Sequence, residues 1–169
     1  MHIICSHGRG GSPDDAIMQQ LAKTAGRFCD AVSSIHDTDI QQDPEARAAR
    51  LIQNIQNLPA QEPVILAGFS MGGYTSVLAA EQCRQVRGLF LVAPALYLPH
   101  YAQHRYSNDL INVEIVHGWS DNVVIFEHSL RFARECNAPL HLLPGGHMML
   151  SQLSRIDELF SQYLQRVIK

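Results

Sequence analysis

Short apolar runs of strand length alternate with segments of helical periodicity along the whole chain. The clearest run, Pro-Val-Ile-Leu-Ala at residues 63–67, is typical of a strand that is buried on both faces of a parallel sheet. Alternation of such strands with helices predicts a parallel sheet that is covered by helices on both faces and joined by right-handed crossovers. We therefore predict an α/β fold, a three-layer αβα sandwich with about six parallel strands.

The hydrophobic pattern and the turn residues set the bounds of the expected elements. The predicted strands span residues 2–6, 29–35, 63–67, 88–92, 112–116 and 139–143. The predicted helices span residues 14–26, 44–57, 70–82, 123–135 and 149–167. Two helix starts carry capping signals, Ser12 followed by Pro13 and Asp43 followed by Pro44.

A chain of 169 residues suits a single domain, which we expect to span residues 1–169. Apolar residues make up 46% and charged residues 17%, so a sizeable core is expected and disorder is not. The net charge of −3 argues against a nucleic-acid partner, because phosphate-backbone binding needs a basic face. No apolar run approaches the roughly 20 residues of a membrane span, and no secretory signal pattern opens the chain.

Four widely spaced cysteines, Cys5, Cys29, Cys83 and Cys136, include no Cys-x-x-Cys pair. This spacing disfavours a zinc or thioredoxin-like site, and four cysteines in a chain of this length do not make a disulfide scaffold. We expect free thiols in a reducing cytoplasm.

A serine follows the 63–67 strand in the sequence Gly68-Phe69-Ser70-Met71-Gly72-Gly73, directly before a helical segment. A Gly-x-Ser-x-Gly sequence between a buried strand and a helix predicts a sharp turn that projects the serine hydroxyl above the sheet. Five positions alone match often by chance, but the placement between strand and helix makes the pattern much more specific. We predict that Ser70 is a nucleophile; the alternative is a tight turn with a solvated serine.

A serine hydroxyl is a poor nucleophile unless a neighbouring base accepts its proton. His147 follows the last predicted strand, so we expect it at the same sheet edge as Ser70; His7 and His117 compete because each lies at a strand end. Asp121 follows the fifth strand and is the predicted acid that fixes the imidazole tautomer. Its alternative role is to cap the following helix.

Acyl transfer also needs two donors for the oxyanion. One predicted donor is the backbone N–H of Met71, directly after the nucleophile, and the other is that of Arg9 in the loop after the first strand. For the Arg9 side chain we expect pairing with Asp37 or Asp39, with a substrate carboxylate as the alternative.

Together these residues resemble the α/β-hydrolase superfamily. The resemblance rests on Ser6-His7-Gly8-Arg9-Gly10, Gly68-Phe69-Ser70-Met71-Gly72-Gly73, His117-Gly118-Trp119-Ser120-Asp121 and Gly145-Gly146-His147, which occur in the superfamily's order across nearly the whole chain. The chain is most similar to small bacterial members without a cap, of the RBBP9/YdeN type or dienelactone-hydrolase-like. The resemblance implies a serine hydrolase with the triad Ser70, Asp121 and His147, an acyl-enzyme intermediate and no cofactor.

The chain departs from the superfamily in three respects. The usual sheet has eight strands, whereas here the first two are missing, which leaves an expected order of 2-1-3-4-5-6. Dienelactone hydrolases use a cysteine where this chain has Ser70. The segment after the fourth strand, residues 94–111, is too short to build a large cap, so we expect an open, shallow site for a small ester or thioester.

Apolar residues beside the catalytic loops are candidates for an acyl pocket. We predict that Trp119, Phe69, Leu96 and Met148 bind the substrate. No metal is expected, because His100 and His104 lack a third ligand. The expected partner is a small-molecule acyl substrate, and the sequence leaves the oligomeric state open.

Two alternatives keep the same scaffold. The first is a non-catalytic protein-interaction domain, because a fold alone does not determine function. The second keeps the triad but performs cofactor-free lyase or peroxidase chemistry. A His147 turned away from Ser70 would favour the first, and trapping of an acyl-enzyme would count against the lyase.

Overall fold

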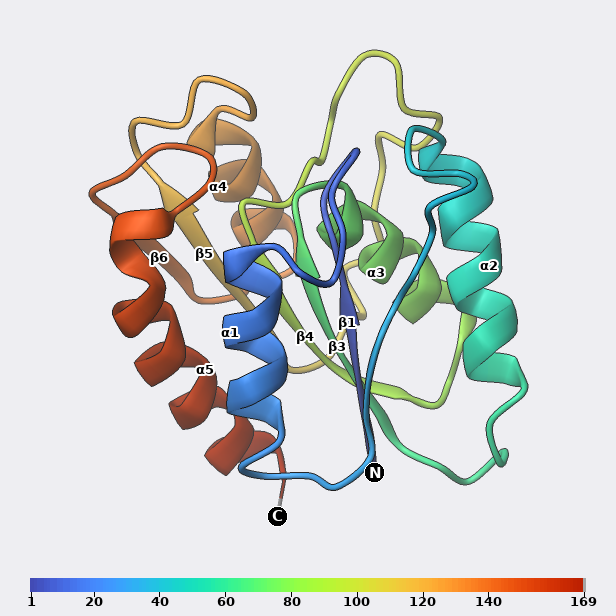
Figure 1. Cartoon of the computed structure of the whole chain (residues 1–169). Coiled ribbons are helices and arrows are strands. Elements are labelled where there is room, and N and C mark those ends of the chain that lie inside the picture. Colours follow the sequence, from blue (N-terminus) through green and yellow to red (C-terminus); the bar gives the residue numbers. More distant parts are fainter. Residues whose placement is uncertain (169) are drawn as a thin grey trace.

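The computed structural model describes residues 1–168 and contains a six-stranded sheet between two layers of helices (Figure 1). The strands are β1 (His2–Ser6), β2 (Val32–Ser34), β3 (Val64–Phe69), β4 (Val86–Val92), β5 (Val113–Gly118) and β6 (Leu140–Leu143). They lie in the order β2-β1-β3-β4-β5-β6, and every neighbouring pair is parallel. The predicted three-layer αβα sandwich and strand order are confirmed.

The helices divide between the two faces of this sheet. They are α1 (Ala16–Ala25), α2 (Pro44–Gln56), α3 (Met71–Gln82), α4 (Phe126–Glu135) and α5 (Leu153–Val167), the last preceded by a short 3₁₀ turn (Leu150–Gln152). Figure 1 shows α1 and α5 in front of the sheet and α3 and α4 behind it. The buried side chains of α2 belong to the same apolar cluster as those of α3 and α4.

Alternating side chains of β1, β3 and β4 pack into two apolar cores, one on each face of the sheet. In β1, Ile3 packs with α1 and α5, whereas Ile4 packs with α2 and α3. All of β3 is buried, which agrees with its unbroken apolar sequence. On the α5 side, the rings of Phe90 and Phe160 stack with their centroids 4.5 Å apart. Burial of each such side chain stabilises the fold by about 1.5–3 kcal/mol.

One of the two predicted caps is confirmed. Asp43 caps α2, because its carboxylate accepts hydrogen bonds from the N–H groups of the second and third helical residues, and Pro44 is the first. The Ser12 cap is wrong, since α1 begins only at Ala16. The Asp15 carboxylate instead accepts the N–H of Ser12, and this bond holds residues 12–15 in a turn before the helix.

The connection from β4 to β5, residues 93–112, contains neither helix nor strand, so no large cap covers the sheet edge. Aromatic contacts anchor it: the rings of Tyr97 and Tyr106 meet edge to face with centroids 5.1 Å apart, and Tyr101 packs on Tyr74 of α3 at 4.7 Å. The connection is therefore a packed loop that borders the carboxyl ends of the strands.

The two outer strands are short: β2 has three residues and β6 has four. The four cysteines are free thiols, as predicted. Among the helices that the structure describes, none combines the length and apolarity needed to span a membrane.

Candidate active site

A sharp turn between β3 and α3 presents Ser70. Only this residue separates the end of the strand from the start of the helix, and its backbone has φ 53° and ψ −117°. The turn is tied on both sides: the Ser70 N–H donates to the carbonyl of Val92, and the Ser70 carbonyl accepts the N–H of Gly73. A positive φ strains a residue that carries a Cβ, so these bonds hold the serine in a conformation that it would not adopt alone.

The turn also depends on close backbone approach. A Cβ on Gly72 would lie 1.9 Å from the carbonyl oxygen of Ser6, and a Cβ on Gly68 would lie 2.4 Å from that of Gly72. Only glycine permits β1, β3 and α3 to meet at these distances. The Gly-x-Ser-x-Gly sequence therefore serves the packing as well as the exposure of the serine hydroxyl.

His147 joins Ser70 to Asp121. Its Nε2 lies 2.9 Å from Ser70 Oγ, and its Nδ1 lies 2.7 Å from Asp121 Oδ2. The three residues come from the loops after β3, β5 and β6, which open at the same edge of the parallel sheet. The Phe69 ring packs against the imidazole, with centroids 5.2 Å apart. The structure thus brings together the three residues that the sequence singled out.

Asp121 is buried and accepts hydrogen bonds through both carboxylate oxygens. Oδ1 accepts the N–H groups of Val123 and Val124, each at 2.9 Å, while Oδ2 faces His147 and, at 3.0 Å, His117 Nε2. Burial opposes ionisation, but the hydrogen bonds from both imidazoles and both N–H groups outweigh it and hold the pKa of Asp121 well below its usual range. The carboxylate is therefore ionised at neutral pH.

The Asp121 bonds also correct one helix boundary. The sequence predicts a helix from residue 123, yet α4 begins at Phe126. The Asp121 carboxylate binds the N–H groups of Val123 and Val124 and keeps them in a turn before the helix. A helix cap was the alternative role for Asp121, and the structure shows that capping-type bonds to the backbone and contact with His147 coexist.

Two other histidines, His7 and His117, competed for the role of base, and the structure places both elsewhere. His117 is fully buried behind Asp121, with Nδ1 2.7 Å from Ser129 Oγ. His7 is also buried, and its Nδ1 donates to the carbonyl of Gly8 at 2.8 Å. Burial lowers the pKa of His7 and so favours the neutral ring.

The two predicted oxyanion donors border Ser70. Met71 is the first residue of α3, and Arg9 lines the cavity above Ser70 together with Gly8. Within residues 1–168, neither the Met71 N–H nor the Arg9 N–H donates to a protein acceptor. Both are thus available to a ligand oxygen.

The predicted pairing of the Arg9 side chain is wrong. Its Nε donates to Gln42 Oε1 at 2.5 Å. Asp37 pairs instead with Arg47 at 2.9 Å, and Asp39 pairs with Arg50 at 2.6 Å. Both of these arginines come from α2, which packs beside the two carboxylates and leaves Arg9 at the rim of the cavity.

A cavity of about 480 Å³ lies over Ser70. It is lined by Gly8, Arg9, Gly10, Gly11, Asp15, Phe69, Ser70, Ala95, Leu98, His100, Tyr101, Val123, Val124, His147 and Met148. The 93–112 connection contributes mainly apolar side chains to this lining, together with His100, and the segment after β1 contributes three glycines and the charged Arg9 and Asp15. This volume lies within the range of small-molecule sites.

Two of the four predicted pocket residues, Phe69 and Met148, line this cavity. Leu96 does not: it is fully buried in the core, whereas Leu98 reaches the cavity. Tyr97 has φ 58°, which turns the chain between the two leucines. Trp119 lies outside the lining residues and is 54% exposed, so the structure does not bring it to the cavity.

The comparisons agree with this architecture. The family model of serine aminopeptidase S33 matches residues 39–112, a segment that includes Ser70 but neither Asp121 nor His147. A protein assigned to the alpha/beta superfamily of hydrolases, from Xanthomonas campestris pv. campestris, has 25% identity and a TM-score of 0.89, covering 98% of both chains. The chain belongs to the α/β-hydrolase superfamily.

Two further solved structures share the fold of this α/β-hydrolase. Est1E from Butyrivibrio proteoclasticus is 18% identical with a TM-score of 0.78, over 98% of this chain and 87% of Est1E. The ydeN gene product of B. subtilis is 19% identical with a TM-score of 0.78, over 97% of this chain and 98% of the other. A comparison with curated protein sequences gave no significant match.

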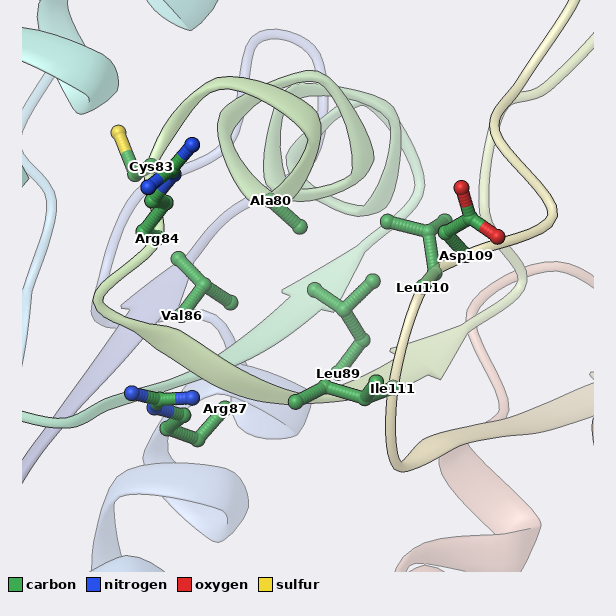
Figure 2. A pocket seen from close by; sticks show the side chains of 9 residues that line it. All are labelled: Ala80, Cys83, Arg84, Val86, Arg87, Leu89, Asp109, Leu110 and Ile111. Atoms are coloured by element: carbon green, nitrogen blue, oxygen red, sulfur yellow. The ribbon is translucent and has the colours of Figure 1, made fainter.

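A second cavity of the α/β-hydrolase, about 280 Å³, lies near the start of β4 and thus at the opposite edge of the sheet. Figure 2 shows the side chains of Ala80, Val86, Leu89 and Leu110 pointing into it. Its one thiol, Cys83, is disfavoured as a nucleophile, because burial raises its pKa. Across residues 1–168, no cluster of three or more histidine, cysteine or acidic side chains is arranged to hold a metal ion.

Proposed function

We propose that this α/β-hydrolase is a serine hydrolase that cleaves a small ester or thioester through an acyl-enzyme intermediate. The observation that carries the proposal is the position of His147, which lies within hydrogen-bond distance of Ser70 on one side and of Asp121 on the other. A serine hydroxyl paired with an imidazole, itself paired with an ionised carboxylate, is an activated nucleophile.

In the first step, Ser70 Oγ attacks the substrate carbonyl carbon and its proton passes to His147 Nε2. The ionised Asp121 accepts the Nδ1–H of His147, fixes the tautomer that leaves Nε2 unprotonated, and stabilises the imidazolium that forms. The buried position of Asp121 and its backbone hydrogen bonds keep that carboxylate in one orientation throughout.

The tetrahedral intermediate carries a negative charge on the former carbonyl oxygen. The N–H groups of Met71 and Arg9 are the proposed donors to it, and both lack a protein acceptor within the described chain. The N-terminus of α3, which begins at Met71, adds favourable partial positive charge.

Collapse of the intermediate breaks the bond to the leaving group, which takes the proton from His147 Nε2 as an alcohol or thiol. A water molecule then gives a proton to Nε2 and attacks the acyl carbon on Ser70. The acid leaves, and the serine recovers its proton. The balance requires only the substrate and one water.

The cavity supports a small substrate. Its volume of about 480 Å³ is open to solvent at an edge that has no large cap, and Phe69, Leu98, Tyr101 and Met148 offer it apolar surface. The fold neighbour Est1E has been solved with ferulic acid bound. We therefore place short acyl and aromatic acyl esters first among the substrates to test.

Mass spectrometry of the intact protein after exposure to a fluorophosphonate tests the proposal. We expect one adduct on the wild type, none on Ser70→Ala, and much slower labelling of His147→Ala. Ser120→Ala is the matched control and should label like the wild type, because Ser120 is an exposed serine on the loop after β5. Hydrolysis of p-nitrophenyl acetate, a thioester and an aminoacyl anilide then separates the acyl classes.

The proposal fails if the folded wild type gains no adduct after long exposure. That result would favour the protein-interaction domain on the same scaffold. Labelling that persists in Ser70→Ala would also contradict it, because the reactive hydroxyl would then lie elsewhere.

We also propose a reducing compartment, the cytoplasm, for this enzyme. The four cysteines are free thiols, and three of them are buried. Fractionation of cells that express the chain tests the location, and recovery with extracellular or periplasmic proteins would contradict it.

A further inference from the structure

One buried cation lies beneath the candidate oxyanion donors. Arg47, on the inner face of α2, has a side chain with no exposed surface. Its ionic partner is Asp37, whose carboxylate is shared with Arg50 of the same helix. Burying a guanidinium is costly even when it is paired, and a buried ion pair is weak evidence of a stabilising role.

The shorter of the remaining hydrogen bonds of Arg47 go to the backbone of the loop after β1, and Nη2 also donates to Ser6 Oγ at 3.4 Å. Nη2 donates to the carbonyl of His7 at 2.6 Å, and Nη1 donates to the carbonyl of Gly8 at 3.2 Å. Nη1 also lies 3.3 Å from the Sδ atom of Met71. One guanidinium therefore touches both segments that carry the proposed oxyanion donors.

The Gly8 carbonyl and the Arg9 N–H belong to the same peptide group. The structure has no cis peptide bonds within residues 1–168, so these two groups point in opposite directions. The carbonyl is held by Arg47, by the His7 ring and by the N–H of Gly11. Holding the carbonyl toward Arg47 turns the Arg9 N–H away from it, and that N–H has no acceptor in the described chain.

A cation at the carbonyl also polarises the peptide. Hydrogen bonds in series strengthen one another in a site of low dielectric constant, so the Arg9 N–H becomes a stronger donor while its carbonyl accepts from a guanidinium. Arg47 thus orients and polarises the Arg9 N–H without itself lining the cavity.

We propose that Arg47 is a positioning residue for the oxyanion hole: it fixes and polarises the Gly8–Arg9 peptide from below and braces Met71. The inference rests on the proposed serine hydrolysis, since the hole has a role only if an oxyanion forms. Arg47 acts through the backbone and does not touch the substrate.

The test compares Arg47→Gln with the control Arg50→Gln. Both substitutions remove one positive charge and one Asp37 contact from α2, but Arg50 donates to Asp37 and Asp39 alone, not to the loop after β1. We expect Arg47→Gln to lower kcat and the rate of fluorophosphonate labelling about 10- to 100-fold with KM changed less than about twofold. This is less than the roughly 10²–10³ in kcat that complete loss of one oxyanion donor costs, because the Arg9 N–H is misoriented and not removed. Arg50→Gln should stay within about twofold of the wild type in kcat, in KM and in the rate of fluorophosphonate labelling.

A second readout does not depend on activity. The backbone amide resonance of Arg9 should shift in Arg47→Gln and stay in place in Arg50→Gln. If the wild type neither labels nor hydrolyses esters, the proposed function fails, and this resonance still decides whether Arg47 orients the peptide. An unmoved Arg9 resonance overturns the inference.

A double variant covers the case in which Arg47→Gln does not fold. Asp37→Leu with Arg47→Met replaces the ion pair by apolar side chains, an exchange that is often neutral or stabilising. We expect this protein to fold yet label about 10- to 100-fold more slowly than the wild type, as above. Labelling at the wild-type rate by either folded variant would overturn the inference, as would a loss that merely follows the fraction of folded protein.

Discussion

The strained backbone at Ser70 predicts that removing the nucleophile's side chain completely stabilises the fold more than shortening it does. Ser70→Ala and Ser70→Gly both lose the hydroxyl and its contact with His147, so the difference between them isolates the backbone. Only glycine adopts φ 53° and ψ −117° without a Cβ penalty.

The magnitude follows from two opposing contributions. Holding a residue with a Cβ in this region costs about 1–3 kcal/mol. Glycine has more conformational freedom than alanine in the unfolded chain, and this lowers the stability of Ser70→Gly relative to Ser70→Ala by about 0.4–1 kcal/mol. Ser70→Gly should therefore be more stable than Ser70→Ala by about 1 kcal/mol, which corresponds to a rise of roughly 2–4 °C in Tm for a chain of this size.

Urea denaturation followed by far-ultraviolet circular dichroism measures this difference. The same pair of substitutions at Ser76, a buried residue inside α3, is the control, and there alanine should be the more stable by about 1 kcal/mol. If Ser70→Ala equals or exceeds Ser70→Gly in stability, the turn is not strained and the reasoning is refuted.

Three further predictions concern packing, charge and the pocket. Gly72→Ala should destabilise the fold by about 3 kcal/mol, the upper end of overpacking costs, because its Cβ would meet the Ser6 carbonyl at 1.9 Å. Thermal denaturation measures this loss, and an unchanged Tm would contradict it. Asp121→Asn should lower the free energy of unfolding by about 1–3 kcal/mol at pH 7. The NH₂ group of the asparagine amide would face buried N–H donors where the carboxylate oxygen now accepts from them. Hydrogen bonds outweigh burial and depress the pKa of Asp121 in the folded state. The difference in free energy of unfolding between the wild type and Asp121→Asn should therefore narrow as the pH falls below about 4, and a difference that stays constant with pH would contradict this prediction. Leu98→Ala should raise KM for apolar esters with little change in stability, because Leu98 lines the cavity. Leu96→Ala should cost about 2–5 kcal/mol of stability without changing KM, because Leu96 is fully buried in the core. The opposite pattern would place Leu96 in the pocket.

The parallel sheet and the meeting of Ser70, Asp121 and His147 could be predicted from the sequence, because they depend on rules that act locally or on the whole sheet. The strand order followed only from the resemblance to the α/β-hydrolase superfamily. Unbroken apolar runs mark buried parallel strands, and the carboxyl ends of such strands share one edge. Loops that follow three of these strands therefore open at the same edge of the sheet, whatever the details of the helices between them.

The partners of charged side chains are harder to predict, because they depend on which helix or loop packs beside each carboxylate in the folded chain. The sequence predicts that Arg9 pairs with Asp37 or Asp39, but α2 places Arg47 and Arg50 beside those carboxylates. The sequence does carry one signal: Arg47 lies four and eight positions before Leu51 and Ile55, so helical spacing places it on the buried face of α2. The spacing does not show which acceptors its buried guanidinium finds.

Loop residues were also hard to assign. Leu96 and Leu98 have similar chemistry and lie two positions apart, yet the positive φ of Tyr97 sends one into the core and the other to the cavity. The sequence predicts Trp119 as a pocket residue because it lies near Asp121, but the turn after β5 leaves it on the surface. Such choices are made by tertiary packing, not by composition.

The shortness of β2 and β6 has a consequence for the behaviour of the protein at high concentration. An exposed outer strand offers a row of unpaired backbone groups on which another molecule can add a strand and begin to aggregate. With three and four residues, the two outer strands offer only brief templates for such pairing. Changes that lengthen either strand would enlarge that template, so efforts to stabilise this sheet should be directed to its centre.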